Sequence, residues 1–196
     1  MLLAFSQLEN AFEHMVGAGS KRFVIWFTGI SGAGKTTIAS IVEQRLIDRG
    51  LPVHNLDGDE LRLGLNKDLG FTDADRRENI RRVGELSRLF NNAGMIVLVA
   101  AISPFREGRD MARELAGPNN FVEVHVDTPL EVAEERDPKG LYQRARSGQL
   151  KNFTGIDSPY EAPLHPEVRV DSARVSASEA ADQIVRTLIS LDLITE

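Results

Sequence analysis

The chain alternates short apolar runs with longer segments whose apolar residues recur at helical spacing. Five runs are predicted as strands, at residues 22–29, 52–56, 95–101, 121–127 and 167–171. Four segments are predicted as helices, at residues 35–49, at 73–93, from about 129 and at 176–192. Strands that alternate with helices form parallel sheets, and "RFVIWFTG" and "MIVLVAA" are apolar throughout, as strands buried on both faces are. The pattern predicts an α/β fold, a parallel sheet with helices on both faces.

The predicted elements form one domain over residues 21–196, an ordinary length for a single domain. Residues 1–20 are interpreted as an N-terminal helical segment and linker, because apolar residues recur at helical spacing over 8–16. The stretch from about 137 to 166 is rich in Gly, Pro and polar residues. We interpret it as a lid, because loops of this length in compact domains usually cover a site.

Composition and charge exclude several function classes. The net charge of −6 argues against a general nucleic-acid-binding surface, and the absence of cysteine excludes disulfides, thiolate metal sites and a cysteine nucleophile. The N-terminus lacks the pattern of a signal peptide, and no apolar run reaches the length of a transmembrane helix. We therefore expect a cytoplasmic enzyme that binds neither nucleic acid nor membrane. Its start at Met1 favours a free-standing chain.

Residues 29–36, "GISGAGKT", match the motif G-x-x-x-x-G-K-[ST] and lie between a predicted strand and a predicted helix. Glycines let such a P-loop curl around phosphates, and the helix N-terminus adds partial positive charge. Lys35 is expected to reach the β- and γ-phosphates, and the Thr36 hydroxyl to ligate Mg²⁺. The sequence thus predicts a site for ATP and Mg²⁺ formed by Gly29, Ile30, Ser31, Gly32, Ala33, Gly34, Lys35, Thr36 and Thr37.

A P-loop alone does not distinguish a kinase from an ATPase or a GTPase. The chain has no guanine-specifying N-K-x-D, since the aspartate in "NKDLG" (66–70) comes one position early. The strand in "MIVLVAAISP" ends without the acid that motor and transporter ATPases usually carry there. The nearest strand-end acids, Asp57 and Asp59, follow the second strand instead. This arrangement favours a small-molecule kinase.

Polar residues continue the buried stripe of the helix predicted at 73–93. Toward its N-terminus the apolar positions give way to Arg76 and Asn79, which are therefore predicted to point inward. An inward arginine needs an anionic partner. That partner is either an acceptor, which Arg62 and Arg106 would also bind, or a neighbouring acid in a salt bridge.

Two aromatic residues, Phe71 and Phe153, lie in polar segments outside the predicted core. Each either stacks on a base or plugs the loop against the domain. Together with the arginines, they favour an acceptor that is itself an adenine nucleotide.

With these features, the chain resembles the adenylyl-sulfate kinases (APS kinases) from about Val24 to Asp171. The resemblance rests on "WFTGISGAGKTT", "LDGDELRLGLNKDLGF", "DRRENIRRVGE", "ISPFREGRD", "RDPKGLYQRAR" and "KNFTGIDSPYE". The first motif is common to many P-loop proteins, whereas the other five, in this order, are specific to the family. The resemblance implies a P-loop, nucleoside-kinase-like fold. It also implies ATP-dependent phosphorylation of the ribose 3′-OH of adenylyl sulfate, giving 3′-phosphoadenylyl sulfate and ADP in sulfate assimilation.

The resemblance also implies roles for individual residues. Asp59 and Lys35 would act at the reacting groups, and Ser103 matches a serine assigned in the family as a phosphoserine intermediate. The implied acceptor-binding residues are Asp57, Asp59, Arg62, Phe71, Arg76, Asn79, Ile102, Ser103, Lys139, Leu141 and Phe153. Thr36 and Asp59 would hold the metal. The family resemblance and the amphipathic N-terminal segment suggest a homodimer.

P-loop kinases transfer the phosphoryl group in line, and positioning with charge neutralisation suffices. We therefore prefer direct transfer, with Asp59 orienting the 3′-OH, to an intermediate on Ser103. Three alternatives stay open: a kinase of a nucleoside or sugar acid, a non-catalytic sensor of 3′-phosphoadenylyl sulfate, and one domain of a fused sulfate-activating protein. Intact Lys35 and Thr36 argue against the sensor.

Overall fold

A computed structural model describes residues 21–195 of the chain. The helix predicted within residues 1–20 lies outside the described residues. The strands are β1 (Val24–Thr28), β2 (Val53–Asp57), β3 (Ile96–Ala100), β4 (Phe121–Asp127) and β5 (Val168–Asp171). The α-helices are α2 (Lys35–Ile47), α3 (Gly58–Leu63), α4 (Asp73–Asn92), α5 (Arg106–Ala116), α6 (Leu130–Arg136), α7 (Leu141–Arg146) and α8 (Ala177–Ser190), and a 3₁₀ turn, η1, spans Pro118–Asn120.

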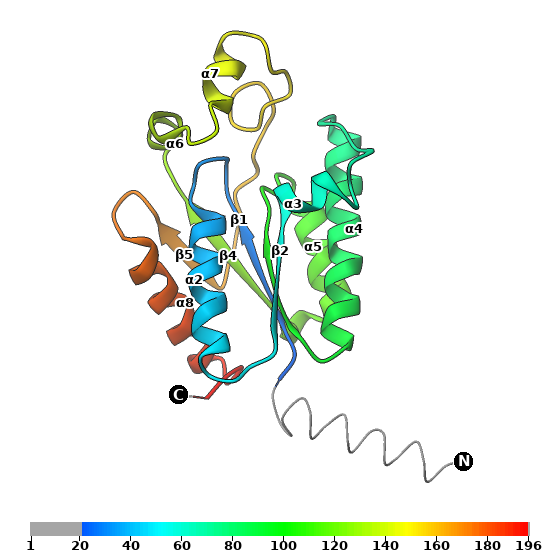
Figure 1. Cartoon of the computed structure of the whole chain (residues 1–196), viewed down its shortest axis with the longest axis vertical. Helices are drawn as coiled ribbons and strands as arrows, with labels where there is room; N and C mark the ends of the chain where they lie inside the picture. Colours follow the sequence, from blue (N-terminus) through cyan, green and yellow to red (C-terminus); the bar gives the residue numbers. More distant parts are fainter. Residues whose placement is uncertain (1–20, 196) are drawn as a thin grey trace, which may run out of the picture.

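The five strands form one parallel sheet in the order β2-β3-β1-β4-β5, which confirms the predicted fold class. β1 is central and pairs with β3 and β4, so the loop that leaves it lies at the middle of the sheet. Because every strand runs the same way, all carboxyl ends meet at one edge, and the lid (residues 137–166) lies over that edge (Figure 1).

Helices cover both faces of the sheet, α2 and α8 on one side and α4 and α5 on the other (Figure 1). The side chains of β1, and of Phe23 just before it, point alternately to the two faces of the sheet. Phe23, Ile25 and Phe27 pack in the core under α2 and α8, while Val24 and Trp26 pack in the core under α4 and α5. All five side chains are fully buried, which explains the unbroken apolar run of this strand.

Two helices begin at the capping motifs that hydroxyl residues supply. Thr72 caps α4 and Ser176 caps α8, each in a reciprocal capping box with an acidic residue three positions later. As predicted, Arg76 and Asn79 continue the buried stripe of α4 at its N-terminal end. The Thr72 cap therefore fixes where these two polar side chains enter the interior.

Three helices, α3, α5 and α7, were not predicted from the apolar pattern of the sequence. α3 and α7 each span six residues, too few to show helical periodicity. α5 spans eleven residues, but its buried residues are Arg109 and Ala112. A buried arginine removes the apolar stripe by which a helix is recognised from sequence.

Candidate active site

The P-loop joins the central strand β1 to α2 and curls at the carboxyl edge of the sheet. Gly29 has φ 148°, and a Cβ there would lie 2.5 Å from the carbonyl oxygen of Val126, so only glycine fits this approach to β4. Gly34 takes a left-handed conformation, φ 101°, and caps the N-terminus of α2. These glycines aim the start of α2, with its partial positive charge, into the site, as phosphate binding requires.

Lys35 is buried against the P-loop. Its Nζ donates to the carbonyl oxygens of Gly29 at 2.9 Å and Ile30 at 2.8 Å. Burial lowers the pKa of Lys35 from 10.5 to about 8, opposed by the charge of Asp59. The two carbonyl contacts hold the ammonium group at the P-loop. Because burial disfavours its charge, an anionic ligand bound beside it would stabilise the charged form.

A hydrogen bond joins the P-loop helix to the end of β2. The Thr36 hydroxyl donates to Asp57 Oδ2 at 2.7 Å. The other oxygen of Asp57 accepts from the backbone N–H of Asp59 at 2.8 Å and from that of Glu60, so Asp57 also caps α3. The Thr36 hydroxyl, the Asp57 carboxylate and the Asp59 carboxylate two residues further on are hard oxygen ligands of the kind that Mg²⁺ prefers. These oxygen ligands therefore fit the predicted Mg²⁺. The carboxylate that contacts Thr36 directly is that of Asp57.

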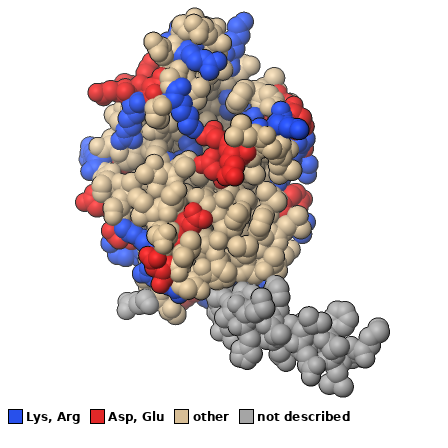
Figure 2. Space-filling view, viewed as in Figure 1, with Lys and Arg blue, Asp and Glu red and all other residues tan. Residues whose placement is uncertain are grey.

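Asp59 forms an ion pair with Lys139 of the lid. Both side chains are exposed, at 69% and 54%, so the pair stabilises the fold little and exchanges partners easily. Figure 2 shows an acidic cluster in the middle of this face, with basic side chains gathered on the lid above it. The contact brings a lid cation to the acid predicted to serve the acceptor hydroxyl.

Arg62 and Arg76 meet at Phe71. Their guanidinium carbons lie 4.5 Å and 5.7 Å from the centre of the Phe71 ring. Arg76 is buried, and it donates to the carbonyl oxygens of Phe71 at 3.1 Å and Asn152 at 2.5 Å. Backbone carbonyls, rather than the alternative of a neighbouring acid, thus satisfy this arginine. Burial lowers the pKa of Arg76, and the Arg62 charge lowers it further. Two crowded cations at an aromatic ring favour an anionic ligand.

Phe153, on the lid, is 7% exposed and packs edge-on against Tyr142 in the core, with ring centres 4.9 Å apart. Asp157 holds the backbone here, because its carboxylate accepts from the N–H groups of Asn152 at 2.8 Å and Phe153 at 2.5 Å. These two bonds lower the pKa of Asp157. The Asp157 carboxylate thus fixes the backbone conformation at Asn152 and Phe153.

Ser103 lies in the turn after β3 and has φ 45°, a strained conformation for a residue other than glycine, costing on the order of 1 kcal/mol. Its side chain is 2% exposed. The hydroxyl accepts from Trp26 Nε1 at 2.9 Å and donates to the carbonyl oxygen of Ala101 at 3.2 Å. Both hydrogen-bonding roles of this hydroxyl are therefore filled within the protein.

One cavity of about 880 Å³ connects these groups. Of the residues predicted from sequence, its wall includes Ser31, Gly32, Gly34, Lys35, Thr36, Thr37, Asp59, Arg62, Phe71, Arg76, Asn79, Ile102, Ser103, Lys139, Leu141 and Phe153. The predicted P-loop residues Gly29, Ile30 and Ala33 form the buried side of the loop, and Asp57 contacts the site through Thr36. The cavity therefore runs from the P-loop to the aromatic and arginine cluster.

Some wall residues were missed, and one candidate lies elsewhere. Arg136, Arg144, Lys151, Asn152 and Thr154 also line the cavity. Arg136 ends α6 and the other four belong to the lid, and their signal in the sequence was that they lie within two of the motifs that carry the family resemblance. Arg106 does not join the arginine cluster, which is a correction: its guanidinium donates to the carbonyl oxygen of Ala162, and its backbone N–H to Glu161.

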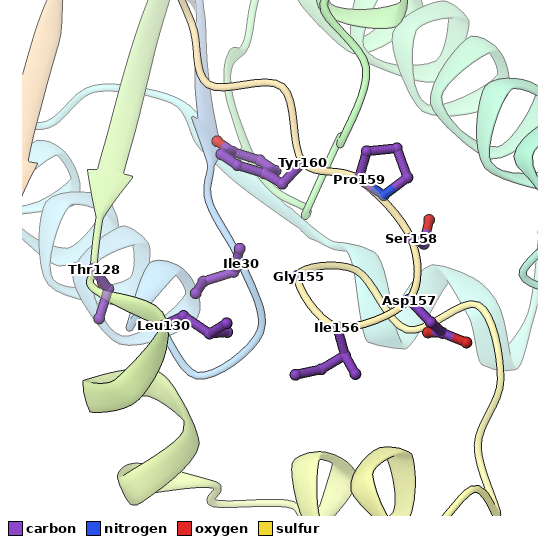
Figure 3. Close-up of a pocket in the computed structure, with 9 residues that line it drawn as sticks. All are labelled: Ile30, Thr128, Leu130, Gly155, Ile156, Asp157, Ser158, Pro159 and Tyr160. Atoms are coloured by element: carbon purple, nitrogen blue, oxygen red, sulfur yellow. The ribbon is translucent and has the colours of Figure 1, made fainter.

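A second, open hollow lies where the far end of the lid meets the P-loop (Figure 3). Ile30 and Leu130 face Gly155 across it, and Tyr160 closes one end. Gly155 has φ 93°, and a Cβ there would come within 3.3 Å of the Leu130 side chain. The lid thus packs closely on the back of the P-loop before it returns to the sheet.

A P-loop on the central strand, acids at the end of β2, two strands away in the sheet, and a lid over both define a P-loop kinase. The model of the adenylylsulphate kinase family matches residues 21–171. The chain belongs to this family.

Relatives of known identity agree. The chain is 58% identical to the adenylyl-sulfate kinase of Burkholderia ambifaria over 86% of this chain and 93% of that protein. It is 52% identical to a probable adenylyl-sulfate kinase of Bacillus subtilis, over 90% of this chain and 88% of that one. The solved structure of a Mycobacterium tuberculosis APS kinase, in complex with AMPPNP and APS, superposes with a TM-score of 0.83 and 46% identity. That match covers 87% of this chain and 99% of the other.

The Asp157 carboxylate gives the site a testable pH dependence. Folding lowers its pKa, so its stabilisation is complete above the unfolded value of roughly 4 and is lost as pH falls through the lower folded value. We predict that the protection of the Asn152 and Phe153 amides, measured as the intrinsic exchange rate divided by the observed rate at the same pH, is high at pH 6 and falls at acid pH before global unfolding. Asp157→Asn should accelerate this exchange at pH 6, and Asp48→Asn, at the end of α2, should not. Equal protection in the Asp157 variant would contradict the assignment.

Proposed function

We propose that the protein is an ATP-dependent adenylyl-sulfate kinase, which phosphorylates the ribose 3′-OH of adenylyl sulfate and releases ADP. The observation that carries this proposal is the single cavity that joins the P-loop to Phe71, Phe153, Arg62 and Arg76. A planar base fits between aromatic rings, and the phosphosulfate is an anion for the two arginines. The complex of the Mycobacterium tuberculosis enzyme with AMPPNP and APS supports the same pair of ligands here.

The donor half of the site would neutralise charge. Lys35, freed from its two carbonyl contacts, would bind the β- and γ-phosphates, and the N-terminus of α2 would add its backbone N–H groups. Mg²⁺, held by Thr36 with Asp59 or Asp57, would supply further positive charge at the transferring group. Basic lid residues Lys139 and Arg144, both in the cavity wall, would complete this neutralisation.

Asp59 would orient the acceptor hydroxyl. A secondary hydroxyl is a poor acid, so holding it in line with the γ-phosphorus contributes more than removing its proton beforehand. Lys139 would leave Asp59 for a phosphate, because their ion pair is solvent-exposed and weak. Substrate binding itself would thereby free the carboxylate for the hydroxyl.

The transfer would be direct, without an intermediate on Ser103. The Ser103 hydroxyl is buried and bonded to Trp26 and Ala101, so a phosphoryl group there would break both contacts. Its role in this proposal is to shape the cavity wall.

An ADP-release assay with adenylyl sulfate, compared with nucleosides and sugar acids as acceptors, tests the proposed function. Adenylyl sulfate should support turnover at least a hundredfold more efficiently, in kcat/KM, than the other acceptors. A faster reaction with a sugar acid or nucleoside would overturn the proposal in favour of another small-molecule kinase. The predicted homodimer and cytoplasmic location are separate expectations, and light scattering of the full chain tests the first.

Asp59→Asn should lower kcat by at least a hundredfold, because the amide no longer accepts the hydroxyl proton or holds the metal as a carboxylate does. ATP affinity, measured by calorimetry, should stay within threefold, since the P-loop supplies those contacts. Glu60→Gln, at the neighbouring position on α3, is the matched control and should behave as wild type. Near-normal turnover of the Asp59 variant would refute its role.

Phe153→Ala should raise the KM for adenylyl sulfate about tenfold, because stacking on a base contributes roughly 1–3 kcal/mol. The KM for ATP should stay within twofold. As a control, Phe90→Ala removes an aromatic ring near the C-terminus of α4, where it stacks on His54. This change should leave both KM values unchanged. If acceptor affinity is unchanged in the Phe153 variant, the ring is a plug of the lid and not part of the binding site.

A further inference from the structure

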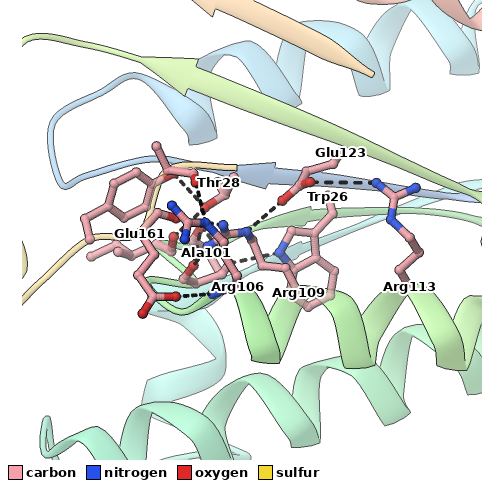
Figure 4. Close-up of polar contacts among 12 residues, drawn as sticks. Trp26, Thr28, Ala101, Arg106, Arg109, Arg113, Glu123 and Glu161 are labelled. Atoms are coloured by element: carbon pink, nitrogen blue, oxygen red, sulfur yellow. Dashed lines mark hydrogen bonds and ion pairs between the residues drawn. The ribbon is translucent and has the colours of Figure 1, made fainter. Parts of the chain in front are cut away.

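A buried ion pair lies behind the wall of the cavity, between α5 and the sheet. Arg109 is 2% exposed, and its Nε donates to Glu123 Oε1 on β4 at 2.6 Å. One terminal nitrogen donates to the carbonyl oxygen of Ser103 at 2.6 Å, and the other to the carbonyl oxygen of Glu161 at 2.7 Å. Figure 4 shows these contacts converging on one guanidinium. Arg109 is not among the residues that line the cavity.

These contacts join three segments that are distant in sequence. Ser103 belongs to the strained turn after β3, which lines the cavity, and Glu161 belongs to the returning end of the lid. The same turn receives a hydrogen bond from the Thr28 hydroxyl to the carbonyl of Ile102 at 2.7 Å. In both bonds the turn supplies the acceptor: Thr28 donates to the carbonyl oxygen of Ile102, and Arg109 donates to that of Ser103.

The chemistry at this point requires an arginine. Burial raises the pKa of Glu123, which the Arg109 charge opposes, so the pair carries a desolvation cost that an apolar pair would avoid. An apolar pair, however, would remove the only donor that the described residues supply to the Glu161 carbonyl oxygen and leave the Ser103 carbonyl oxygen with the 3.5 Å contact from Thr28 alone. A lysine has the charge, but it lacks the planar fork that reaches three acceptors in fixed directions.

We propose that Arg109 is a positioning residue for acceptor binding, which holds the main chain of Ile102 and Ser103 at the cavity wall and ties the end of the lid to it. This inference rests on the proposed function, because it needs adenylyl sulfate as the acceptor. The donor site is independent of it, since Arg109 has no contact with the P-loop among its hydrogen bonds and ion pairs.

Arg113 provides a matched control on the same helix, one turn further on. It approaches Glu123 at 3.7 Å, bonds the carbonyl of Phe121 and forms an ion pair with Glu167, so it also joins α5 to the sheet. It does not contact the turn at Ile102 and Ser103, as Figure 4 shows by its position beyond Glu123. Arg109→Gln and Arg113→Gln therefore remove the same charge from one helix, with and without the proposed link.

The test is initial-rate kinetics on the full chain, with adenylyl sulfate and ATP varied separately and melting temperature recorded for each variant. Arg109→Gln should raise the KM for adenylyl sulfate at least tenfold while the KM for ATP stays within twofold. Arg113→Gln should lower the melting temperature yet leave both KM values within twofold of wild type. A folded Arg109 variant with an unchanged acceptor KM, or with both KM values raised together, would overturn the proposal.

Thr28→Val keeps the shape of a strand residue and removes the hydroxyl contacts to the carbonyl oxygens of Ile102 and Ser103 and to the Tyr160 hydroxyl of the lid. It therefore loosens the same link between the turn and the lid, and it serves as the test if Arg109→Gln fails to fold. It should raise the acceptor KM at least threefold with the KM for ATP within twofold, and an unchanged acceptor KM would count against the proposal. Wild-type enzyme in the same assay separates the two claims. If it does not phosphorylate adenylyl sulfate, the proposed function fails; if it does and the variants match it, only the role of Arg109 fails.

Discussion

The hydrogen bond between the Thr36 hydroxyl and the Asp57 carboxylate joins the two halves of the site. Thr36 lies in the first turn of α2, at the predicted phosphate site, and Asp57 ends β2 and caps α3, which carries Asp59 and Arg62. One carboxylate therefore sets the donor side and the acceptor side relative to each other. The rest of the arrangement depends on this link, because in-line transfer demands that the two reacting groups be fixed within about half an ångström.

In this acidic protein, two buried arginines, Arg76 and Arg109, fix loop backbones by donating hydrogen bonds to carbonyl oxygens. Arg76 binds the carbonyl groups of Phe71 and Asn152, and Arg109 binds those of Ser103 and Glu161. In each case a buried guanidinium connects the lid to a segment at the carboxyl edge of the sheet. An irregular loop can close over a site only if its backbone polar groups are satisfied, and arginine satisfies several at once.

The features that could be predicted from the sequence are those determined by residues close together in the chain. The P-loop is set by glycines at fixed spacing, and β1 by an unbroken apolar run, so both could be predicted. The inward course of Arg76 followed from helical periodicity alone. α5 could not be predicted, because Arg109 occupies the place of an apolar residue on its buried face. The expected place of Arg106 was wrong for a related reason: its partners, Glu161 and Ala162, lie some fifty residues away, and no local pattern indicates such a contact.

In the proposed reaction, the phosphoryl group passes directly from ATP to the acceptor within one cavity, while the Ser103 hydroxyl stays bonded to Trp26. The stereochemistry at the transferred phosphorus tests it most directly, using ATP made chiral at the γ-position with sulfur and oxygen isotopes. A single in-line displacement inverts the configuration, and two successive displacements restore it. Direct transfer requires inverted configuration in the 3′-phosphorylated product, and retained configuration would show that an intermediate forms on the enzyme.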